Sequence, residues 1–229
     1  MINTYAAGSE LTMSSMTHTE PIVFVVDDDV SIRESLEHLF RCEGWHAETF
    51  ASASEFLAAP RPSVPSCLVL DVSMPGLNGL ELQKRVANDR PGMPIVFITA
   101  HGNIPMSVKA MKAGAVEFLT KPFTEEVLLA AIRQALERSR NVLSSEKKIQ
   151  ALQDDYGALS HREQEVMALV VTGMLNKQVA GELGISEKTV KAHRGQVMQK
   201  MKAGSFADLV NMAAALRLGR ERPVTDSQP

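Results

Sequence analysis

The chain has 229 residues, of which 45% are hydrophobic and 22% charged, with a formal net charge of -3. This length predicts one large or two modest domains, and the composition excludes disordered, collagen-like and disulfide-dense chains. No apolar run approaches the roughly 20 residues that cross a bilayer, and residues 1–20 contain no Lys or Arg, which argues against a secretory signal. We therefore predict a soluble cytoplasmic protein with no membrane partner, a disordered tail at 1–20 and a loose tail at 220–229.

Charge and cysteine usage refine this expectation. From Glu20 to Arg140 there are 16 acidic and 12 basic residues, whereas from Asn176 to Lys202 there are 2 acidic and 6 basic. The two halves are therefore expected to perform different tasks. Cys42 and Cys67 lie far apart inside predicted regular elements, so we expect reduced core residues rather than a disulfide.

Short β-rich apolar runs alternate with amphipathic segments between Ile22 and Thr120, a pattern typical of βαβ units and a parallel sheet. The predicted strands are Ile22–Val26, His46–Phe50, Cys67–Leu70, Ile95–Thr99 and Glu117–Leu119. The first helix carries an apolar face and is terminated by Gly44. Further helices are predicted near Ser54–Ala58, Leu80–Ala87 and Met106–Lys112, and a fifth begins at a Thr124 cap.

That fifth helix has no evident end before Gly157. If it is continuous from Thr124 to Gln153, it would span about 45 Å. Its heptad seam is broken by Ser139 and Glu146, so a coiled coil and a plain helical linker are both open, and we favour the linker.

Beyond Gly157 the sequence is typical of a small all-α domain with four helices. Ser160 and Glu163 form a predicted capping box, and Asn176 is predicted to cap the second helix. Gly184 ends that second helix, Ser186 caps a third that reaches about Met201, and Ser205 caps the last.

Acidic residues follow two of the predicted strands. Asp27, Asp28 and Asp29 come after the first strand and Asp71 after the third, and chemistry gathers beyond the carboxyl ends of parallel strands. Neighbouring strands would bring Asp27 or Asp28 close to Asp71, where like charges repel unless a cation lies among them. Oxygen ligands with open positions suit Mg²⁺, so the sequence predicts a magnesium site.

The fourth and fifth strands add a hydroxyl and an ammonium at the same edge. Thr99 ends the fourth strand, and Lys121 follows the fifth beside a proline bond of the kind that adopts cis. Taken singly, the aspartates could cap a helix or start a turn, Thr99 could be a strand end and Lys121 a solvated lysine. Together they indicate phosphoryl transfer onto an aspartate.

These segments, Val25–Asp29, Leu70–Gly76, Thr99-Ala100 and Lys121–Phe123, resemble the receiver domain of bacterial two-component response regulators over about residues 20–140. The resemblance implies a doubly wound five-stranded sheet in order 2-1-3-4-5 and phosphorylation of Asp71 by a sensor histidine kinase. It implies that Asp28, Asp71 and the backbone carbonyl of Ser73 bind Mg²⁺, with Asp27 acting through its water. It also implies that Thr99 and Lys121 contact phosphoryl oxygens and that Phe118 is the switch aromatic, a position where the family has Phe or Tyr.

Near the carboxyl end, two short helices around Gly184 fit a helix-turn-helix. A helical projection of Glu187–Met201 puts Val190, Val197 and Met201 on one face, with Arg194 close to its edge. The opposite face holds small and polar residues suited to a major groove, namely Lys188, Lys191, Ala192, Gly195, Gln196 and Gln199. Gly195 costs about 1 kcal/mol in an exposed helix middle. Close approach to DNA would explain it, and a solvated face with an indifferent glycine is the alternative.

The segments Leu159–Glu163, Asn176–Ala180 and Ile185–His193 resemble the LuxR-type output domain of the NarL/FixJ family. With His101-Gly102 and Met111–Ala115, the resemblance is closest to the FixJ-like subgroup, which includes regulators of aromatic-compound degradation. It implies a third helix in the major groove and a fourth that forms a dimer. Lys191 and Ala192 would face bases, Lys177, Thr189 and His193 would lie toward phosphates, and Gly195 replaces a residue that is often bulky and polar. The full predicted DNA-binding set is Lys177, Lys188, Thr189, Lys191, Ala192, His193, Arg194 and Gly195.

The sequence thus predicts an α/β receiver at 21–137, a helical linker at 138–156 and a helix-turn-helix domain at 157–219. We expect a phosphorylation-controlled transcription regulator whose partners are a sensor kinase, operator DNA, a second copy of the chain and RNA polymerase. It would be no enzyme beyond its own phosphotransfer and dephosphorylation. One alternative is a phosphohydrolase, although many of these carry a second aspartate where this chain has Ser73. The other is a small-molecule-sensing regulator, which is disfavoured because the aspartates occupy the place of a ligand pocket.

Overall fold

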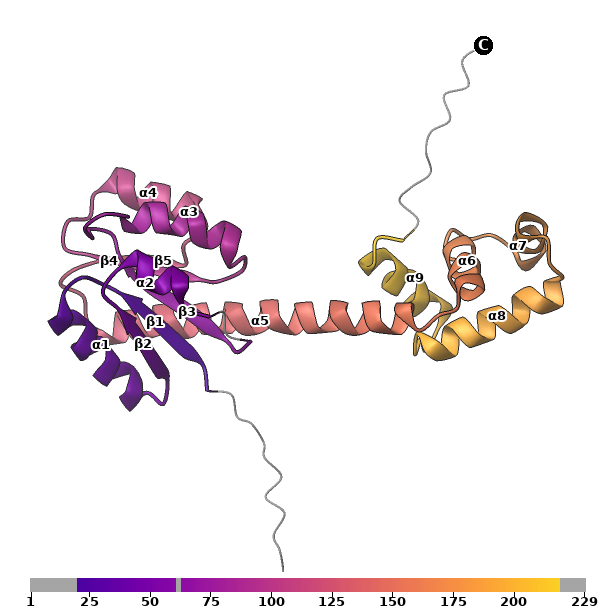
Figure 1. Cartoon of the computed structure of the whole chain (residues 1–229), viewed down its shortest axis with the longest axis horizontal. Coiled ribbons are helices and arrows are strands. Elements are labelled where there is room, and N and C mark those ends of the chain that lie inside the picture. Colours follow the sequence, from indigo (N-terminus) through magenta and orange to yellow (C-terminus); the bar gives the residue numbers. More distant parts are fainter. Residues whose placement is uncertain (1–19, 61–62, 219–229) are drawn as a thin grey trace, which may run out of the picture. The chain divides into compact units, whose positions relative to one another are not determined.

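The computed structural model describes residues 20–60 and 63–218. The chain divides into two compact units between Asn141 and Val142. Apart from Glu20, the predicted tails at 1–20 and 220–229 lie outside the described residues. The units are shown together in Figure 1, and each is described below by itself.

The first unit is built on a parallel sheet whose strand order is β2-β1-β3-β4-β5, as the receiver resemblance implies (Figure 1). Its strands are β1 (Ile22–Val26), β2 (His46–Phe50), β3 (Ser66–Asp71), β4 (Ile95–Thr99) and β5 (Glu117–Thr120). β3 starts one residue earlier than predicted and ends on Asp71 itself, while β5 extends to Thr120. The predicted phosphoacceptor is therefore fixed by the sheet rather than by a loop.

Helices cover both faces of this sheet. They are α1 (Val30–Cys42), α2 (Ala53–Ala58), α3 (Gly79–Asp89), α4 (Ile104–Lys112) and α5 (Glu125–Gly157). Buried residues of α1 and α5 pack on one face, and those of α2, α3 and α4 pack on the other. Gly44, two residues after α1, has the positive φ of 77° that its predicted role as terminator requires. The two apolar layers hold the strand ends in place.

α5 is one helix of 33 residues and includes the whole segment predicted as a linker. Its first half belongs to the core of the first unit through Leu128, Ile132 and Leu136. The predicted break in its seam at Ser139 has a structural cause, because the buried Ser139 hydroxyl accepts a hydrogen bond of 3.0 Å from the Ser66 backbone N–H. This contact joins α5 to the start of β3.

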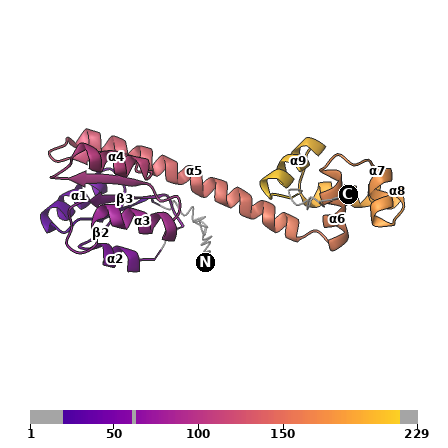
Figure 2. The ribbon, with the colours of Figure 1, turned by 90° about the horizontal axis from the view of Figure 1, so that it is seen from above.

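The second unit is all-α, as predicted, with α6 (His161–Val170), α7 (Asn176–Leu183), α8 (Glu187–Lys200) and α9 (Phe206–Ala215) following α5 (Figure 2). Their apolar faces form one core, against which Leu152 and Tyr156 of α5 also pack. Serine side chains cap α6, α8 and α9, as the sequence predicts.

Two local predictions are wrong. Asn176 does not cap α7; the N-cap is Leu175, and the Asn176 Oδ1 atom instead accepts a hydrogen bond from Arg194. Cys67 is buried in β3, but Cys42 is exposed because it lies outside the apolar face that α1 turns to the sheet. Both cysteines are free. Among the described helices, none combines the length and apolar character needed to span a membrane.

Candidate functional site

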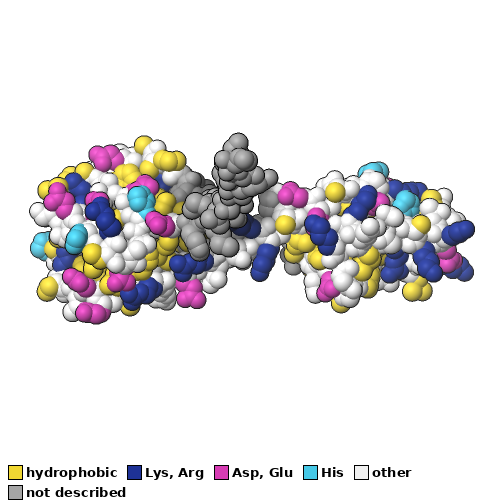
Figure 3. Space-filling view, turned by 90° about the horizontal axis from the view of Figure 1, so that it is seen from below, with side chains coloured by type: hydrophobic (Ala, Val, Ile, Leu, Met, Phe, Trp, Pro, Cys, Tyr) yellow, Lys and Arg dark blue, Asp and Glu magenta, His cyan; other side chains and the backbone are white. Residues whose placement is uncertain are grey.

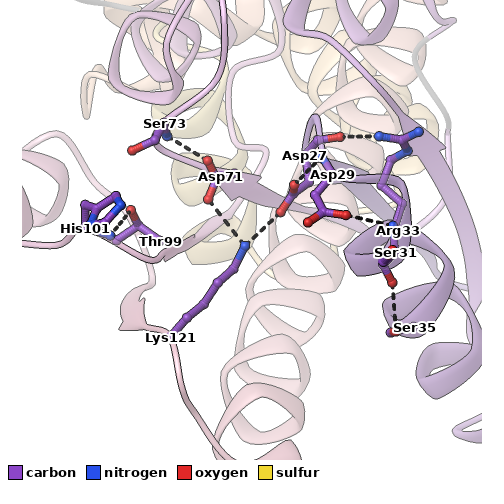
Figure 4. Close-up of polar contacts among 10 residues, drawn as sticks. All are labelled: Asp27, Asp29, Ser31, Arg33, Ser35, Asp71, Ser73, Thr99, His101 and Lys121. Carbon is purple, nitrogen blue, oxygen red and sulfur yellow. Dashed lines mark hydrogen bonds and ion pairs between the residues drawn. The ribbon is translucent and has the colours of Figure 1, made fainter.

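Asp27 and Asp71 lie side by side at the carboxyl edge of the sheet, because β1 and β3 pair in parallel with Val26 opposite Leu70 (Figure 4). Both carboxylates are buried, with 1% and 5% of their residue surfaces exposed. The Lys121 Nζ atom lies 3.0 Å from Asp27 Oδ2 and 3.5 Å from Asp71 Oδ1. One ammonium therefore bridges the two aspartates that the sequence places on neighbouring strands.

The ends of β4 and β5 hold the hydroxyl and the ammonium at this edge. The Lys121 backbone N–H donates to the Thr99 carbonyl at 2.7 Å, and the peptide bond from Lys121 to Pro122 is cis. Thr99 is fully buried, and its hydroxyl oxygen accepts a hydrogen bond of 3.2 Å from the His101 N–H (Figure 4). Aspartate, threonine and lysine thus gather as the sequence predicts.

The environment raises the pKa of the Asp71 carboxyl above its ordinary value. Burial is the largest cause, and the charge of Asp27 acts in the same direction. The hydrogen bond of 2.7 Å from the Ser73 N–H and the Lys121 ammonium act the other way without offsetting the burial. The ionised form of Asp71 is therefore incompletely compensated, and an additional cation would stabilise it.

The donor set at this edge fits Mg²⁺. Asp28 is exposed directly beside Asp27, and Ser73 follows Asp71 by two residues, so carboxylate and carbonyl oxygens are available at one strand edge. Within residues 20–60 and 63–218, no three His, Cys, Asp or Glu side chains form a metal cluster on their own. Mg²⁺ does not need such a cluster, because it commonly binds through one or two carboxylates and keeps waters.

Two residues that support the site were missed by sequence reasoning. Arg33 of α1 donates to the Asp27 backbone carbonyl at 2.7 Å. Gly79 begins α3 so close to the strand end that a Cβ atom there would overlap the Asp71 carbonyl oxygen. The Asn78-Gly79 pair was the available signal for Gly79, whereas nothing local marks Arg33. Asp29, in contrast, is the helix cap considered as an alternative, and it accepts from the Ser31 N–H at 2.8 Å.

Phe118, the predicted switch aromatic, is half-buried on β5. Its ring centroid lies 5.9 Å from that of Phe97 in β4. Phe118 also adjoins Gly102, in the loop that follows Thr99. The aromatic ring is therefore connected by packing to the acidic edge.

In the second unit, α8 has the rotation that the helical projection predicts. Val190, Val197 and Met201 are fully buried. The exposed residues of the predicted DNA-binding set are Lys177 on α7 and Lys188, Thr189, Lys191, Ala192 and Gly195 on α8, while His193 and Arg194 are half-buried. On the face that Figure 3 shows, Lys and Arg side chains gather toward the α7 and α8 end of this unit. A basic helix surface is thus available to a polyanion.

Arg194 is engaged within the unit. Its Nη1 atom donates to Asn176 Oδ1 at 2.6 Å, and its guanidinium carbon lies 5.3 Å from the centre of the Phe206 ring. Arg194 therefore ties the starts of α7 and α9 to the middle of α8.

Lys200, near the end of α8, is anchored to α6. Its Nζ atom lies 2.7 Å from the buried Glu163 carboxylate, which also accepts from the Ser160 N–H at 2.7 Å. The pKa of Glu163 is lowered, chiefly by the hydrogen bond from Lys200 and then by that from Ser160. The sequence predicts the capping box of Ser160 and Glu163 but not the ion pair between Glu163 and Lys200.

A doubly wound sheet with aspartates, threonine and lysine at its carboxyl edge, followed by a four-helix unit with an exposed basic helix, defines a receiver joined to a helix-turn-helix DNA-binding domain. Two family models match in agreement with this. Residues 23–133 match the response regulator receiver domain, and residues 157–213 match the bacterial regulatory proteins of the luxR family.

Relatives align with this chain over most of their length. The chain is 52% identical to nodulation protein W of Bradyrhizobium diazoefficiens over 198 residues, which cover 86% of this chain and 87% of that protein. It is 46% identical to the response regulator TodT of Pseudomonas putida over 88% of this chain and 89% of that protein. It is 41% identical to the transcriptional regulator FixJ of Azorhizobium caulinodans over 90% of this chain and 97% of that protein.

Solved structures give the same result. The response regulator StyR is similar with a TM-score of 0.76 and 51% identity, covering 85% of this chain and 98% of that one. Full-length FixJ from B. japonicum is similar with a TM-score of 0.51 and 40% identity, covering 85% and 96%. The chain belongs to the NarL/FixJ family of two-component response regulators, in its FixJ-like group. TodT is a response regulator and FixJ a transcriptional regulatory protein, so the comparisons support the regulator rather than the phosphohydrolase alternative.

Proposed function

We propose that a sensor histidine kinase phosphorylates Asp71 of this regulator and that the acyl phosphate promotes homodimerisation and operator binding. The observation that carries the proposal is the pair of buried aspartates bridged by Lys121, with the pKa of Asp71 raised by burial. Because the proposed partner is operator DNA, we also propose that the protein acts in the cytoplasm.

The chemistry follows from the positions of the side chains. An Asp71 carboxylate oxygen attacks phosphorus, the donor's imidazole nitrogen leaves, and charge accumulates on the transferred oxygens. Lys121, within 3.5 Å of Asp71 Oδ1, neutralises that charge, and the Thr99 hydroxyl donates to a phosphoryl oxygen. Asp28, Asp71 and the Ser73 carbonyl would hold Mg²⁺, with Asp27 acting through a bound water; the ion supplies charge neutralisation at the same oxygens.

A surface on α4 supports the proposed dimer. Ile104, Val108 and Met111 recur at helical spacing and leave 79%, 44% and 43% of their surfaces exposed. An apolar stripe of this kind marks a protein interface. We assign it to a second copy of the phosphorylated chain, with α9 extending the contact between DNA-binding domains.

The DNA contacts that we propose divide by chemistry. Lys191 and Ala192 face base edges in the major groove, with Gly195 on the same exposed side of α8. Lys177, Thr189 and His193 lie toward phosphates, and Lys188 lies on the groove-facing side of α8. For Lys177 this is supported by the start of α7, where the Leu175 side chain caps none of the backbone N–H groups of the first turn beside that lysine. Arg194 acts by positioning the helices, and RNA polymerase is the expected further partner.

The direct test is phosphorylation of the full chain by a small phosphodonor with Mg²⁺. We expect a hydroxylamine-labile adduct that is absent in Asp71→Asn and much reduced in Asp28→Ala. Asp29→Asn is the matched control, because Asp29 is a neighbouring carboxylate that only caps α1. Full labelling of Asp71→Asn would refute the assignment.

A further inference from the structure

Gly102 lies in the loop between β4 and α4 at a place where an added side chain would force its neighbours to shift. A Cβ atom there would lie 2.6 Å from Thr120 Cγ2, 3.0 Å from Phe118 Cε1 and 3.1 Å from Thr99 Cγ2. Gly102 is not among the glycines with positive φ, so its backbone conformation does not require glycine. It is the close packing of neighbouring side chains that disfavours a Cβ atom at this position.

The three contacted side chains all belong to strand ends that form the candidate phosphorylation site. Thr99 presents its hydroxyl to the His101 N–H and its methyl group to Gly102. Thr120 directly precedes Lys121, and Phe118 lies on the same strand. On the other side, Gly102 is followed by Asn103, which caps α4, and by Ile104, the first residue of the exposed apolar stripe. Gly102 therefore lies between the acidic edge and the proposed dimer surface.

We propose that Gly102 is a positioning residue, whose missing side chain lets the loop of residues 100–103 follow Thr99 and Phe118 and so couples Asp71 to α4. This inference rests on the phosphorylation proposed above. An acyl phosphate at Asp71 attracts the Thr99 hydroxyl, and turning that hydroxyl displaces the methyl group at its other end. The Thr99 methyl group lies next to Gly102. When this methyl group moves away, the loop of residues 100–103 moves into the space that it leaves and shifts the start of α4.

A methyl group at position 102 should leave phosphorylation of Asp71 intact and prevent it from promoting dimerisation. In Gly102→Ala the new Cβ meets the Thr120 and Thr99 methyl groups and the Phe118 ring, and no atom of Asp71 or Lys121 lies closer to it than these three side chains. The loop is held away from the strand ends while the acceptor carboxylate and its lysine stay in place. Phosphorylation should therefore persist and its effect on dimerisation should not.

The structure supplies a rescue and an independent second variant. Thr120→Ser removes the methyl nearest to the new Cβ and keeps the hydroxyl, so Gly102→Ala with Thr120→Ser should recover coupling. Thr99→Ser keeps the hydroxyl and deletes the methyl that contacts Gly102, and it should weaken coupling without adding any bulk. Gly181→Ala is the control, because a Cβ there meets nothing within 4 Å.

The experiment uses the full chain, with the phosphorylated fraction measured after treatment with a small phosphodonor and the dimer dissociation constant measured by sedimentation at matched phosphorylation. We expect Gly102→Ala to be phosphorylated like the wild type and to dimerise roughly tenfold more weakly, the order of typical coupling between sites. Phosphorylated Thr99→Ser should also dimerise more weakly than the wild type. Adding Thr120→Ser to Gly102→Ala should restore dimerisation. The Gly181→Ala control should match the wild type.

If phosphorylated Gly102→Ala and Thr99→Ser dimerise like the wild type, the inference about Gly102 is overturned while the proposed function stands. Loss of phosphorylation in a folded Gly102→Ala would also overturn it, because the glycine would then act at the acceptor. If Gly102→Ala fails to fold, the double variant and Thr99→Ser decide by the same criteria. Absence of phosphorylation in the wild type would overturn the proposed function and this inference together.

Discussion

Each unit contains a buried carboxylate, and the protein shifts the pKa values of these two groups in opposite directions. Asp71 and Glu163 are exposed to almost the same extent, 5% and 6%, and each has a lysine partner. Lys200 lies 2.7 Å from Glu163, which also accepts from a backbone N–H, and the pKa of Glu163 is lowered. Lys121 lies 3.5 Å from Asp71 and is shared with Asp27, and the pKa of Asp71 is raised.

The comparison distinguishes a structural charge from a reactive one. The Glu163 carboxylate is compensated inside the protein, so it fixes the start of α6 against the end of α8 and gains little from any ligand. The Asp71 carboxylate is only partly compensated by Lys121 and the Ser73 N–H, so a cation or a transferred phosphoryl group can stabilise this edge further. The lysines of the second unit that we assign to DNA contacts are exposed on α7 and α8, where a polyanion can reach them.

The largest expected effect comes from removing each lysine in turn. Lys121→Ala should slow phosphorylation of Asp71 by about 100- to 1,000-fold, the usual loss when a preorganised group facing the developing charge is deleted. Lys200→Ala should leave that rate unchanged. Initial rates with a small phosphodonor measure both. Equal rates for the two variants would remove the distinction drawn between the two carboxylates.

The exposed lysines of the second unit should differ from each other in DNA binding. Lys191→Ala should cost about 1 to 3 kcal/mol on operator DNA and relax the preference at one base step of each half-site. Lys177→Ala should weaken binding to all sequences equally and reduce the salt dependence by about one ion per site.

Titrations on operator and scrambled DNA at several salt concentrations measure both quantities. Some change of salt dependence is compatible with the account for Lys191, because a lysine at a base edge also approaches phosphates. An unchanged ratio of operator to scrambled affinity in Lys191→Ala would show that α8 enters the groove at another rotation.

Neutral isosteres should shift stability in opposite directions at pH 7. Asp71→Asn should raise the free energy of unfolding of its unit by about 1 kcal/mol, since it removes a buried charge that Lys121 and the Ser73 N–H only partly compensate. Glu163→Gln should lower that of the second unit by about 1 kcal/mol, since the amide preserves the capping box but loses the ion pair with Lys200.

The pH dependence follows from the pKa directions. Glu163 has a lowered pKa, so its contribution is present above the ordinary pKa and is lost as pH falls through the lowered value, where the Gln variant should equal the wild type. Asp71 has a raised pKa, so the advantage of Asn should be full at neutral pH and vanish in acid. Thermal unfolding between pH 3 and pH 7 measures the stability of both units. If Asp71→Asn and Glu163→Gln changed the stability of their units in the same direction at pH 7, the comparison would be contradicted.

The smallest effect concerns Gly195 on the exposed face of α8. A Cβ there meets nothing within 4 Å, and its φ is not positive, so Gly195→Ala should stabilise the second unit by about 0.5 to 1 kcal/mol. Because the added methyl points to the face assigned to DNA, operator binding should weaken. A variant that is more stable and binds equally well would identify Gly195 as an indifferent residue of a solvated face.

Prediction from sequence succeeded where topology alone dictates position. Parallel strands end at one edge, so Asp27, Asp71, Thr99 and Lys121 had to converge once the strands were recognised. It failed where a distant residue competes with a local rule, as at Asn176, whose side chain binds Arg194 eighteen positions away instead of capping α7. Contacts such as Lys200 with Glu163, or the packing at Gly79 and Gly102, depend on tertiary approach and leave no periodic signal.

The central claim is that phosphate on Asp71 controls DNA binding through dimerisation. The most direct measurement is the affinity of the full chain for a DNA fragment recovered by genome-wide mapping of its bound sites, before and after treatment with a phosphodonor and Mg²⁺. The wild type should bind at least tenfold more tightly after treatment, with dimers appearing over the same range, and Asp71→Asn should respond in neither respect. Equal affinity of treated and untreated wild type, at confirmed phosphorylation, would contradict the account.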